Sequence, residues 1–137
     1  MRLITTSVAE MTAEQRTFVD EGFAAGLAEG AFPPTREPPY DTSSIVLAVM
    51  GDEYVGFASF YIPDHYPIVW LDVLYVDPAF RRRSIATFLA SGVMAFAQRE
   101  NLPFECGTLM TNAAMQGLAA SLGLEGSSIL YRKEPVR

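Results

Sequence analysis

The apolar residues of this chain follow two spacings, and the change between them divides it into elements. Residues 12–28 place apolar side chains three or four positions apart, which predicts a helix with one buried face. Thr12 and Gln15 stand at its start with the spacing of a capping box. Residues 2–6 have the composition of a short first strand, and the prolines within residues 30–44 predict a loop.

The middle of the chain has the composition of strands. Residues 44–50 and 53–62 are rich in β-branched and aromatic side chains, and Gly51-Asp52 between them predicts a hairpin turn. Residues 68–76 are largely apolar, which is typical of a strand covered on both faces. We therefore expect a hairpin followed by a buried strand.

The remaining part alternates helices and strands. Helical spacing opens at residue 85 and ends near Arg99, and residues 104–110 are a predicted strand. Asn112 is able to cap a further helix that ends at Gly123, and residues 127–132 close the chain as a strand. No repeat or linker interrupts this order, so all 137 residues are expected to form a single α/β domain.

The composition is that of an acidic globular chain. Half of the residues are apolar and 12% are aromatic, enough for one full core. The formal net charge is −6, or −9 without Arg81, Arg82 and Arg83, which argues against affinity for nucleic acid or an anionic membrane. The single Cys106 excludes an internal disulfide, and no signal pattern or membrane-length apolar run occurs. We expect a cytoplasmic protein with no metal site.

One stretch concentrates the positive charge. The strand at residues 68–76 is followed by Asp77-Pro78, then by Arg81, Arg82 and Arg83, and a helix opens at Ser84. The first N–H groups of a helix have no partner inside it and carry partial positive charge, so they stabilise a phosphate. Arginines add forked donors that suit phosphate oxygens. This order predicts an anion site; the alternative is a solvated basic turn.

The same stretch also contains a motif that resembles a family signature. Val76-Asp77-Pro78 ends a strand, and Arg81-Arg82-Arg83-Ser84-Ile85-Ala86 opens the next helix. This resembles the signature of the GNAT superfamily of N-acetyltransferases, Val-x-Pro and then Gln/Arg-x-x-Gly-x-Gly/Ala. Asn112 after the next strand and Gly123-Leu124 after the next helix resemble its second landmark. Over residues 45–134 the resemblance implies a GNAT-like mixed, mostly antiparallel central sheet flanked by helices on both faces.

The resemblance also implies a cosubstrate, acetyl-CoA. In the family, the backbone at the end of the corresponding strand holds the pantetheine arm and the motif loop holds the pyrophosphate. A small-molecule or protein amine would attack the thioester directly. The cofactor-binding residues implied in this chain are Leu74, Tyr75, Val76, Arg81, Arg82, Arg83, Ser84, Ile85, Ala86 and Asn112, the last of which is alternatively only a helix cap.

Two positions depart from the family pattern. Ser84 replaces the first motif glycine, and we expect its hydroxyl to cap the helix or to donate to a phosphate. Ala119 replaces the tyrosine that protonates the departing thiolate in many members. Tyr75 and Tyr131 are candidate substitute acids, but core packing with a satisfied hydroxyl is the favoured explanation of both. Cofactor binding is thus better supported than catalysis by the usual acid.

Asp72 is the candidate base, because many members carry a glutamate at this strand position. If Asp72 shares a face with Trp70 and Leu74, burial would raise its pKa. The alternative is a carboxylate hydrogen-bonded to a loop. Glu105 competes for the role, or is a solvated surface charge. His65 either lines an acceptor site or is a solvated loop residue.

Three functions therefore stay open. The first is an N-acetyltransferase acting on an amine, and the acidic flanks would suit a cationic acceptor. The second is a non-catalytic member that binds acyl-CoA or a partner protein, which Ser84 and Ala119 favour. The third is an interaction module, which the arginines and Asn112 oppose. Family members are often dimers, so a homodimer is open as well.

Overall fold

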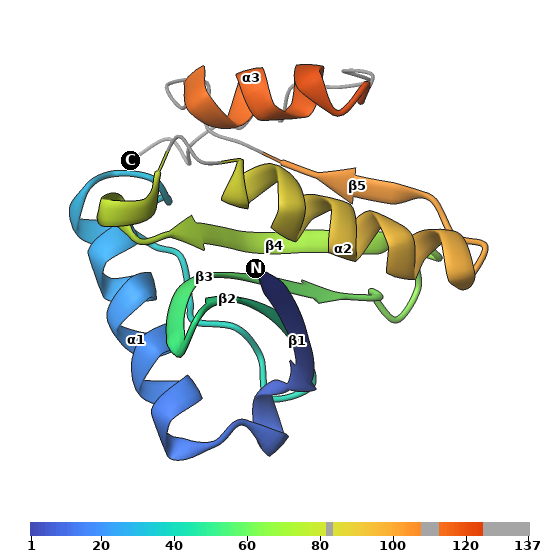
Figure 1. The fold of residues 1–137 in the computed structure, drawn as a ribbon. Coiled ribbons are helices and arrows are strands. Elements are labelled where there is room, and N and C mark those ends of the chain that lie inside the picture. Colours follow the sequence, from blue (N-terminus) through green and yellow to red (C-terminus); the bar gives the residue numbers. More distant parts are fainter. Residues whose placement is uncertain (82–83, 108–112, 125–137) are drawn as a thin grey trace, which may run out of the picture.

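The computed structural model describes residues 1–81, 84–107 and 113–124 and contains an open sheet covered by helices (Figure 1). The strands are β1 (Arg2–Ser7), β2 (Ser44–Met50), β3 (Glu53–Tyr61), β4 (Val69–Val76) and β5 (Phe104–Cys106), and the α-helices are α1 (Ala13–Ala28), α2 (Ile85–Arg99) and α3 (Ala113–Ser121). The strands lie in chain order. Neighbours from β1 to β4 are antiparallel and β5 is parallel to β4, so the expected mixed, mostly antiparallel sheet is confirmed.

Local sequence signals explain where these elements begin and end. The Thr12 hydroxyl accepts the N–H of Gln15, and the Gln15 side chain accepts the N–H of Thr12, so the capping box of α1 is confirmed. Gly51 has a φ of 60° in the hairpin turn, and Gly123 has a φ of 73° after α3. Both angles lie in the left-handed region that glycine adopts without a steric penalty.

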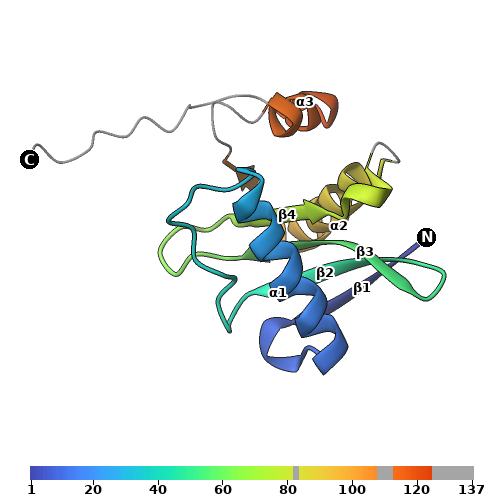
Figure 2. The same cartoon turned by 90° about the vertical axis from the view of Figure 1, so that its left-hand side faces the viewer.

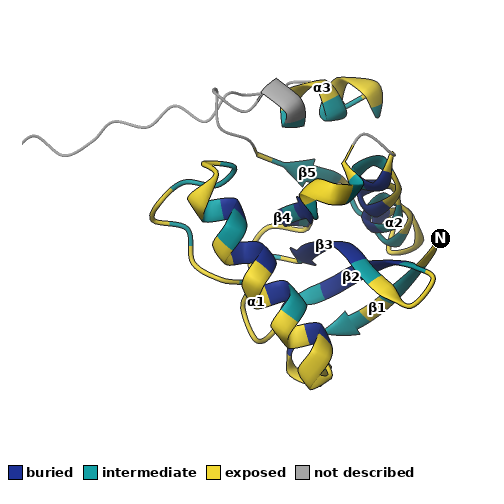
Figure 3. Cartoon of the chain, turned by 60° about the vertical axis from the view of Figure 1, so that its left-hand side comes forward, coloured by how far each residue is buried: buried dark blue, intermediate teal, exposed yellow. Residues whose placement is uncertain are grey.

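Two apolar clusters hold the helices against opposite faces of the sheet (Figure 2). Ile85 and Leu89 of α2 pack with residues of β2, β3 and β4 on one face. Val19 and Phe23 of α1 pack on the other face. The residues of β2, β3 and β4 are accordingly mostly buried (Figure 3), which explains the continuous apolar composition of these strands.

β4 contains a bulge at Asp72. Ser59 of β3 pairs with Val73, whereas the next residue, Phe60, pairs with Leu71, so Asp72 is the additional residue. The buried Ser59 Oγ accepts the N–H of Val73 at 3.1 Å. A side-chain hydroxyl thereby satisfies a main-chain donor beside the bulge.

The bulge overturns the expectation that Asp72, Trp70 and Leu74 share a face. Leu74 packs against the cluster beneath α2. Asp72 instead accepts hydrogen bonds from Trp70 and from Arg36 of the loop after α1. Strict alternation fails because one additional residue reverses the facing of every later position in the strand.

β5 accompanies only the first part of β4. The pairs run from Val69 with Phe104 to Leu71 with Cys106. Within the described ranges, residues 72–76 of β4 therefore continue without a strand partner on this edge. The strand predicted at residues 104–110 is confirmed as far as Cys106.

Some sequence predictions concern residues outside the described part. These are residues 108–110, Asn112 and the strand predicted at residues 127–132. Among the described residues, no helix has the length and apolarity needed to cross a bilayer. In the same part of the chain, no three histidine, cysteine or acidic side chains gather in a way that could hold a metal ion.

Candidate active site

The turn between β4 and α2 carries the motif recognised in the sequence. A short 3₁₀ helix (Pro78–Phe80) opens it, and the Asp77 carboxylate accepts the N–H of Ala79 at 2.9 Å. Ser84 then precedes α2 with a φ of 61° and a ψ of 17°. This left-handed conformation explains why a glycine suits the position.

The Ser84 side chain does not cap α2, so this expectation is wrong. A capping hydroxyl reaches the helical N–H groups from an extended backbone, whereas Ser84 has a left-handed backbone. The first turn of α2 therefore receives no side-chain oxygen from Ser84. Donation by this hydroxyl to a phosphate stays a prediction.

The start of α2 presents main-chain donors. The N–H of Phe88 donates to the Ser84 carbonyl at 3.0 Å, which is the first hydrogen bond of the helix. The N–H groups of Ile85, Ala86 and Thr87 consequently have no partner within α2. Since the Ile85 side chain is buried, any ligand here meets the main chain of this residue, together with the positive end of the helix dipole.

Arg81 is held by groups of the protein itself. Its Nε donates to the Val76 carbonyl at 3.0 Å, and its guanidinium pairs with Glu29, just after α1, at 2.6 Å. It also lies over the Tyr75 ring, 5.7 Å from the centroid. Arg81 thus connects this turn to α1, a role that the sequence did not separate from the adjacent Arg82 and Arg83, which lie outside the described residues.

Tyr75 is a core residue. Its ring lies against Gly22 of α1, where an added Cβ would come within 2.8 Å of the ring. Burial raises the pKa of Tyr75, as do the charges of Glu29 and Asp77, while Arg81 lowers it through its charge and a hydrogen bond. The Tyr75 side chain is thus packed in the core, as the packing alternative predicted.

Asp72 fits both sequence-based expectations, a buried carboxyl with a raised pKa and a carboxylate hydrogen-bonded to a loop. Its side chain is 9% exposed and forms an ion pair with Arg36, which also donates to the Asp72 carbonyl at 2.6 Å. Burial raises the pKa of Asp72, whereas the Arg36 charge and the hydrogen bonds from Trp70 and Arg36 lower it. The carboxylate is therefore bonded to a loop and also has a raised pKa.

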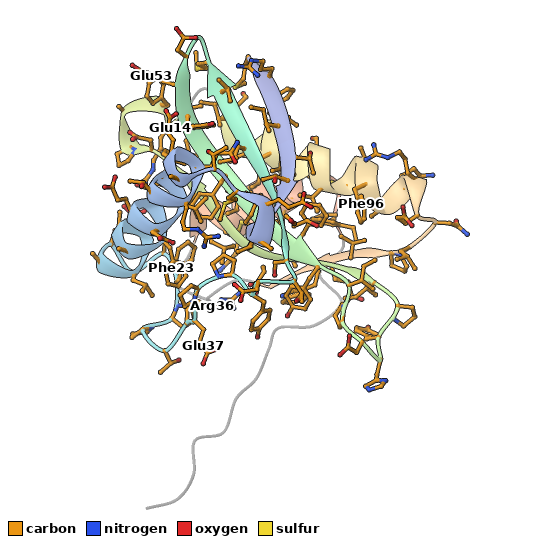
Figure 4. All side chains as sticks on the ribbon, turned by 90° about the horizontal axis from the view of Figure 1, so that it is seen from below. Glu14, Phe23, Arg36, Glu37, Glu53 and Phe96 are labelled. Atoms are coloured by element: carbon orange, nitrogen blue, oxygen red, sulfur yellow. The ribbon has the colours of Figure 1, made fainter. Side chains whose placement is uncertain are left out.

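Arg36 and Tyr61 were missed in the sequence. Arg36 is the only cation in the proline-rich loop, which was a usable signal (Figure 4). Tyr61 pairs across the sheet with Trp70. The pKa of Tyr61 is raised by burial and then by the negative charge of Asp72, so the two side chains are electrostatic neighbours.

The other two candidates for acid–base work, Glu105 and His65, lie on β5 and in the loop before β4. Glu105 of β5 pairs in register with Trp70 and accepts a hydrogen bond from the Tyr66 hydroxyl, which raises the pKa of Tyr66. His65 is exposed in the adjacent loop. Burial raises the pKa of Cys106, which keeps the thiol protonated and weakly nucleophilic.

Ala119 lies in α3, the helix in which a tyrosine was expected from the family. Its carbonyl accepts the N–H of Leu124 at 3.1 Å, in the hydrogen bonding that ends the helix at Gly123. An alanine side chain supplies no proton. Tyr131 lies outside the described residues.

A family model identifies the family of this chain. The model of the acetyltransferase (GNAT) family matches residues 10–124, which extends the resemblance seen from residue 45 into α1. A comparison with the sequences of curated proteins finds no match.

Solved structures with a similar fold cover nearly the whole chain. Aminoglycoside N-acetyltransferase AAC(6')-Iy, solved in complex with CoA, is 22% identical, with a TM-score of 0.70 over 98% of this chain and 100% of that one. An aminoglycoside acetyltransferase from an uncultured soil metagenomic sample, solved with sisomicin, is 13% identical, with a TM-score of 0.75 over 99% and 96%. AAC(6')-IG from Acinetobacter haemolyticus is 19% identical, with a TM-score of 0.62 over the full length of both chains.

Proposed function

Because the chain belongs to the acetyltransferase (GNAT) family, we propose that it transfers an acetyl group from acetyl-CoA to a primary amine by direct attack. The start of α2 carries this proposal. Its left-handed Ser84 is followed by three N–H groups without helical partners, directly after the strand that in this family meets the cofactor. This arrangement fits a pyrophosphate.

The residues that would hold acetyl-CoA form two sets. The N–H groups of Ile85 and Ala86 would bind the pyrophosphate, with Arg82 and Arg83 as additional charges. The main chain of residues 74–76 would bind the pantetheine arm along the β4 edge, since β5 leaves it uncovered in the described part of the chain. When bound, acetyl-CoA supplies the acetyl group as a thioester.

Asp72 would remove the proton that a protonated amine must lose before it attacks. Its burial favours proton uptake, and its pair with Arg36 keeps a carboxylate available. The acceptor amine must then compete with Arg36 for this carboxylate. Glu105 is the alternative base, because it lies opposite Trp70 on the neighbouring strand.

The acid step would be the weak point of the reaction. General-acid assistance typically contributes about 10²–10⁴-fold, and Ala119 provides none. The expected enzyme is therefore slow, with a rate that rises with pH as the amine loses its proton. The neighbours act on aminoglycosides, so these amines come first in a screen.

The proposal is tested by calorimetric titration with acetyl-CoA, followed by an amine panel read out as thiol release. We expect binding, slow release, and a lower turnover without loss of cofactor affinity in Asp72→Asn. Asp52→Asn, an exposed change in the hairpin turn, is the matched control. Absence of acetyl-CoA binding by the wild type would refute the proposal. Full activity of Asp72→Asn would exclude Asp72 as the base and leave Glu105 or a water chain as the candidates.

A non-catalytic acyl-CoA-binding protein is the second candidate. Ala119 favours it, and so does the Arg36 guanidinium that already occupies the Asp72 carboxylate. Binding of acetyl-CoA without thiol release from any amine would establish this alternative. A cytoplasmic location and a homodimer remain part of the proposal, the latter to be measured by sedimentation.

A further inference from the structure

A groove of about 520 Å³ lies beyond the end of β3, away from the turn before α2. Its lining residues are Tyr40, Thr42, Ser44, Phe60, Tyr61, Ile62, Pro63, Asp64 and Phe96. Phe96 comes eleven positions after Ile85 on α2 (Figure 4). At 1.5 Å per residue this is roughly 16 Å along the helix. The groove is therefore separate from the proposed phosphate site.

The groove wall has a definite chemistry. Tyr40 and Tyr61 stand edge to face with ring centroids 5.4 Å apart, and Tyr40 is 51% exposed. The lining also contains hydroxyl-bearing residues and the apolar side chains of Phe96 and Ile62, and Asp64 adds an exposed carboxylate. No lysine or arginine is part of the described lining. Aromatic faces together with a carboxylate attract an organic cation.

The groove adjoins the candidate base through Tyr61. This residue lines the groove and lies in register with Trp70. Its pKa is raised by burial and by the charges of Asp72 and Tyr40, and the charge of Arg36 lowers it. A ligand in the groove would therefore extend toward the pair of Asp72 and Arg36.

We propose that this groove holds the body of the acceptor, an amine with an apolar or aromatic ring and a second cationic group, while the reacting amine lies toward Asp72. The second cation would meet Asp64 and the ring would lie against Tyr40. This inference rests on the proposed acetyl transfer. It adds the class of amine, because a short monoamine would leave both the rings and the second carboxylate unused.

Binding is tested first without any acetyl donor. Benzyltrimethylammonium, which cannot be acetylated, is titrated into the wild type, Tyr40→Leu, Asp64→Asn and the control Asp52→Asn. Tyr40 and Asp64 are exposed, so both variants are expected to fold. Each should weaken binding by about two- to fivefold, the scale of one exposed cation contact, and Asp52→Asn should not. No binding by the wild type would overturn the inference.

Kinetics then separate the groove from the reaction. With 1,4-bis(aminomethyl)benzene as acceptor, Tyr40→Leu and Asp64→Asn should raise KM and leave kcat and acetyl-CoA affinity unchanged, whereas KM for ethylamine should not move. If both variants turn over the diamine with an unchanged KM, the proposed role of the groove is refuted and the proposed acetyl transfer still stands. Loss of acetyl-CoA binding in the wild type would instead refute the proposed function. A dimer that Tyr40→Leu dissociates, without probe binding, would mark the groove as an interface and overturn the inference.

Discussion

At the scale of single residues, Ser84 stands where a side chain is costly. Its φ of 61° is unfavourable for any residue with a Cβ, by about 1–2 kcal/mol. The Ser84 hydroxyl accepts no capping hydrogen bond from α2 that would offset this cost. The conformation nevertheless exposes the first N–H groups of α2. The strain is thus located at the proposed pyrophosphate site.

Ser84→Gly is expected to stabilise the fold by up to about 1 kcal/mol, because it removes the strain without moving the main-chain donors. If the Ser84 hydroxyl donates to a phosphate, acetyl-CoA affinity falls in this variant; if Ser84 only occupies a glycine position, affinity is unchanged or improved. Chemical denaturation and calorimetry measure the two effects. Ser84→Ala is the control that removes the hydroxyl and keeps the strain. Weaker binding by both variants would show that the hydroxyl itself bonds to a phosphate.

Burial raises the pKa of Asp72, and the neighbouring Arg36 charge opposes this rise. Arg36→Met removes the opposing contribution. The base must be ionised to act, so the rise of kcat/KM with pH should shift to higher pH in this variant. Arg36→Lys, which retains a positive charge, should show a smaller shift than Arg36→Met. An identical acidic limb in wild type and Arg36→Met would exclude Asp72 as the base that Arg36 controls.

At the scale of elements, β4 owes its shape to one bulge. Its additional residue, Asp72, faces Arg36, while Leu74 packs beneath α2. The Ser59 hydroxyl that accepts the N–H of Val73 stabilises this irregularity from β3. The position of the candidate base thus depends on a neighbouring strand.

Ser59→Ala should therefore cost about 1–3 kcal/mol of stability, because it leaves the buried N–H of Val73 without its acceptor. Turnover should fall as well, since Asp72 is no longer held in place. Ser59→Thr retains the hydroxyl, and Ser91→Ala on the exposed side of α2 controls for the change of residue type. Denaturation and thiol release report both effects, and a wild-type stability for Ser59→Ala would contradict this role.

The sequence predicted the elements better than their contacts. The capping box at Thr12, the turn at Gly51 and the end of α3 at Gly123 depend on neighbouring residues and were recognised. The bulge at Asp72 depends on the register with β3, which no local pattern reveals. The contact from Arg36 spans 36 positions, so its function became evident only when the fold placed the loop beside β4.

At the scale of the whole molecule, the chain has a formal net charge of −6. A field of this sign raises the local concentration of cationic acceptors and is screened by salt. Increasing the ionic strength from about 0.01 to 0.15 M shortens the Debye length from roughly 30 to 8 Å. The KM for a dicationic amine should rise over this range, by roughly tenfold at most. The comparison is a monoamine of similar size that carries no second charge. If the KM of the two amines depends equally on salt, long-range attraction of the dication is contradicted.

The short pairing of β5 with β4 has a consequence for the lifetime of the protein. Among the described pairs, β5 is bridged to β4 only at Val69, Trp70 and Leu71, which is the shortest ladder in the described part of the sheet. A short ladder opens at lower free energy than a long one. A cosubstrate bound along the same edge of β4 would stabilise the folded state against opening between β4 and β5. Occupancy at a hundred times Kd adds about 2.7 kcal/mol to the folded state. Resistance to proteolysis should then increase with the concentration of acetyl-CoA. Protease digestion with and without the cosubstrate measures this effect directly.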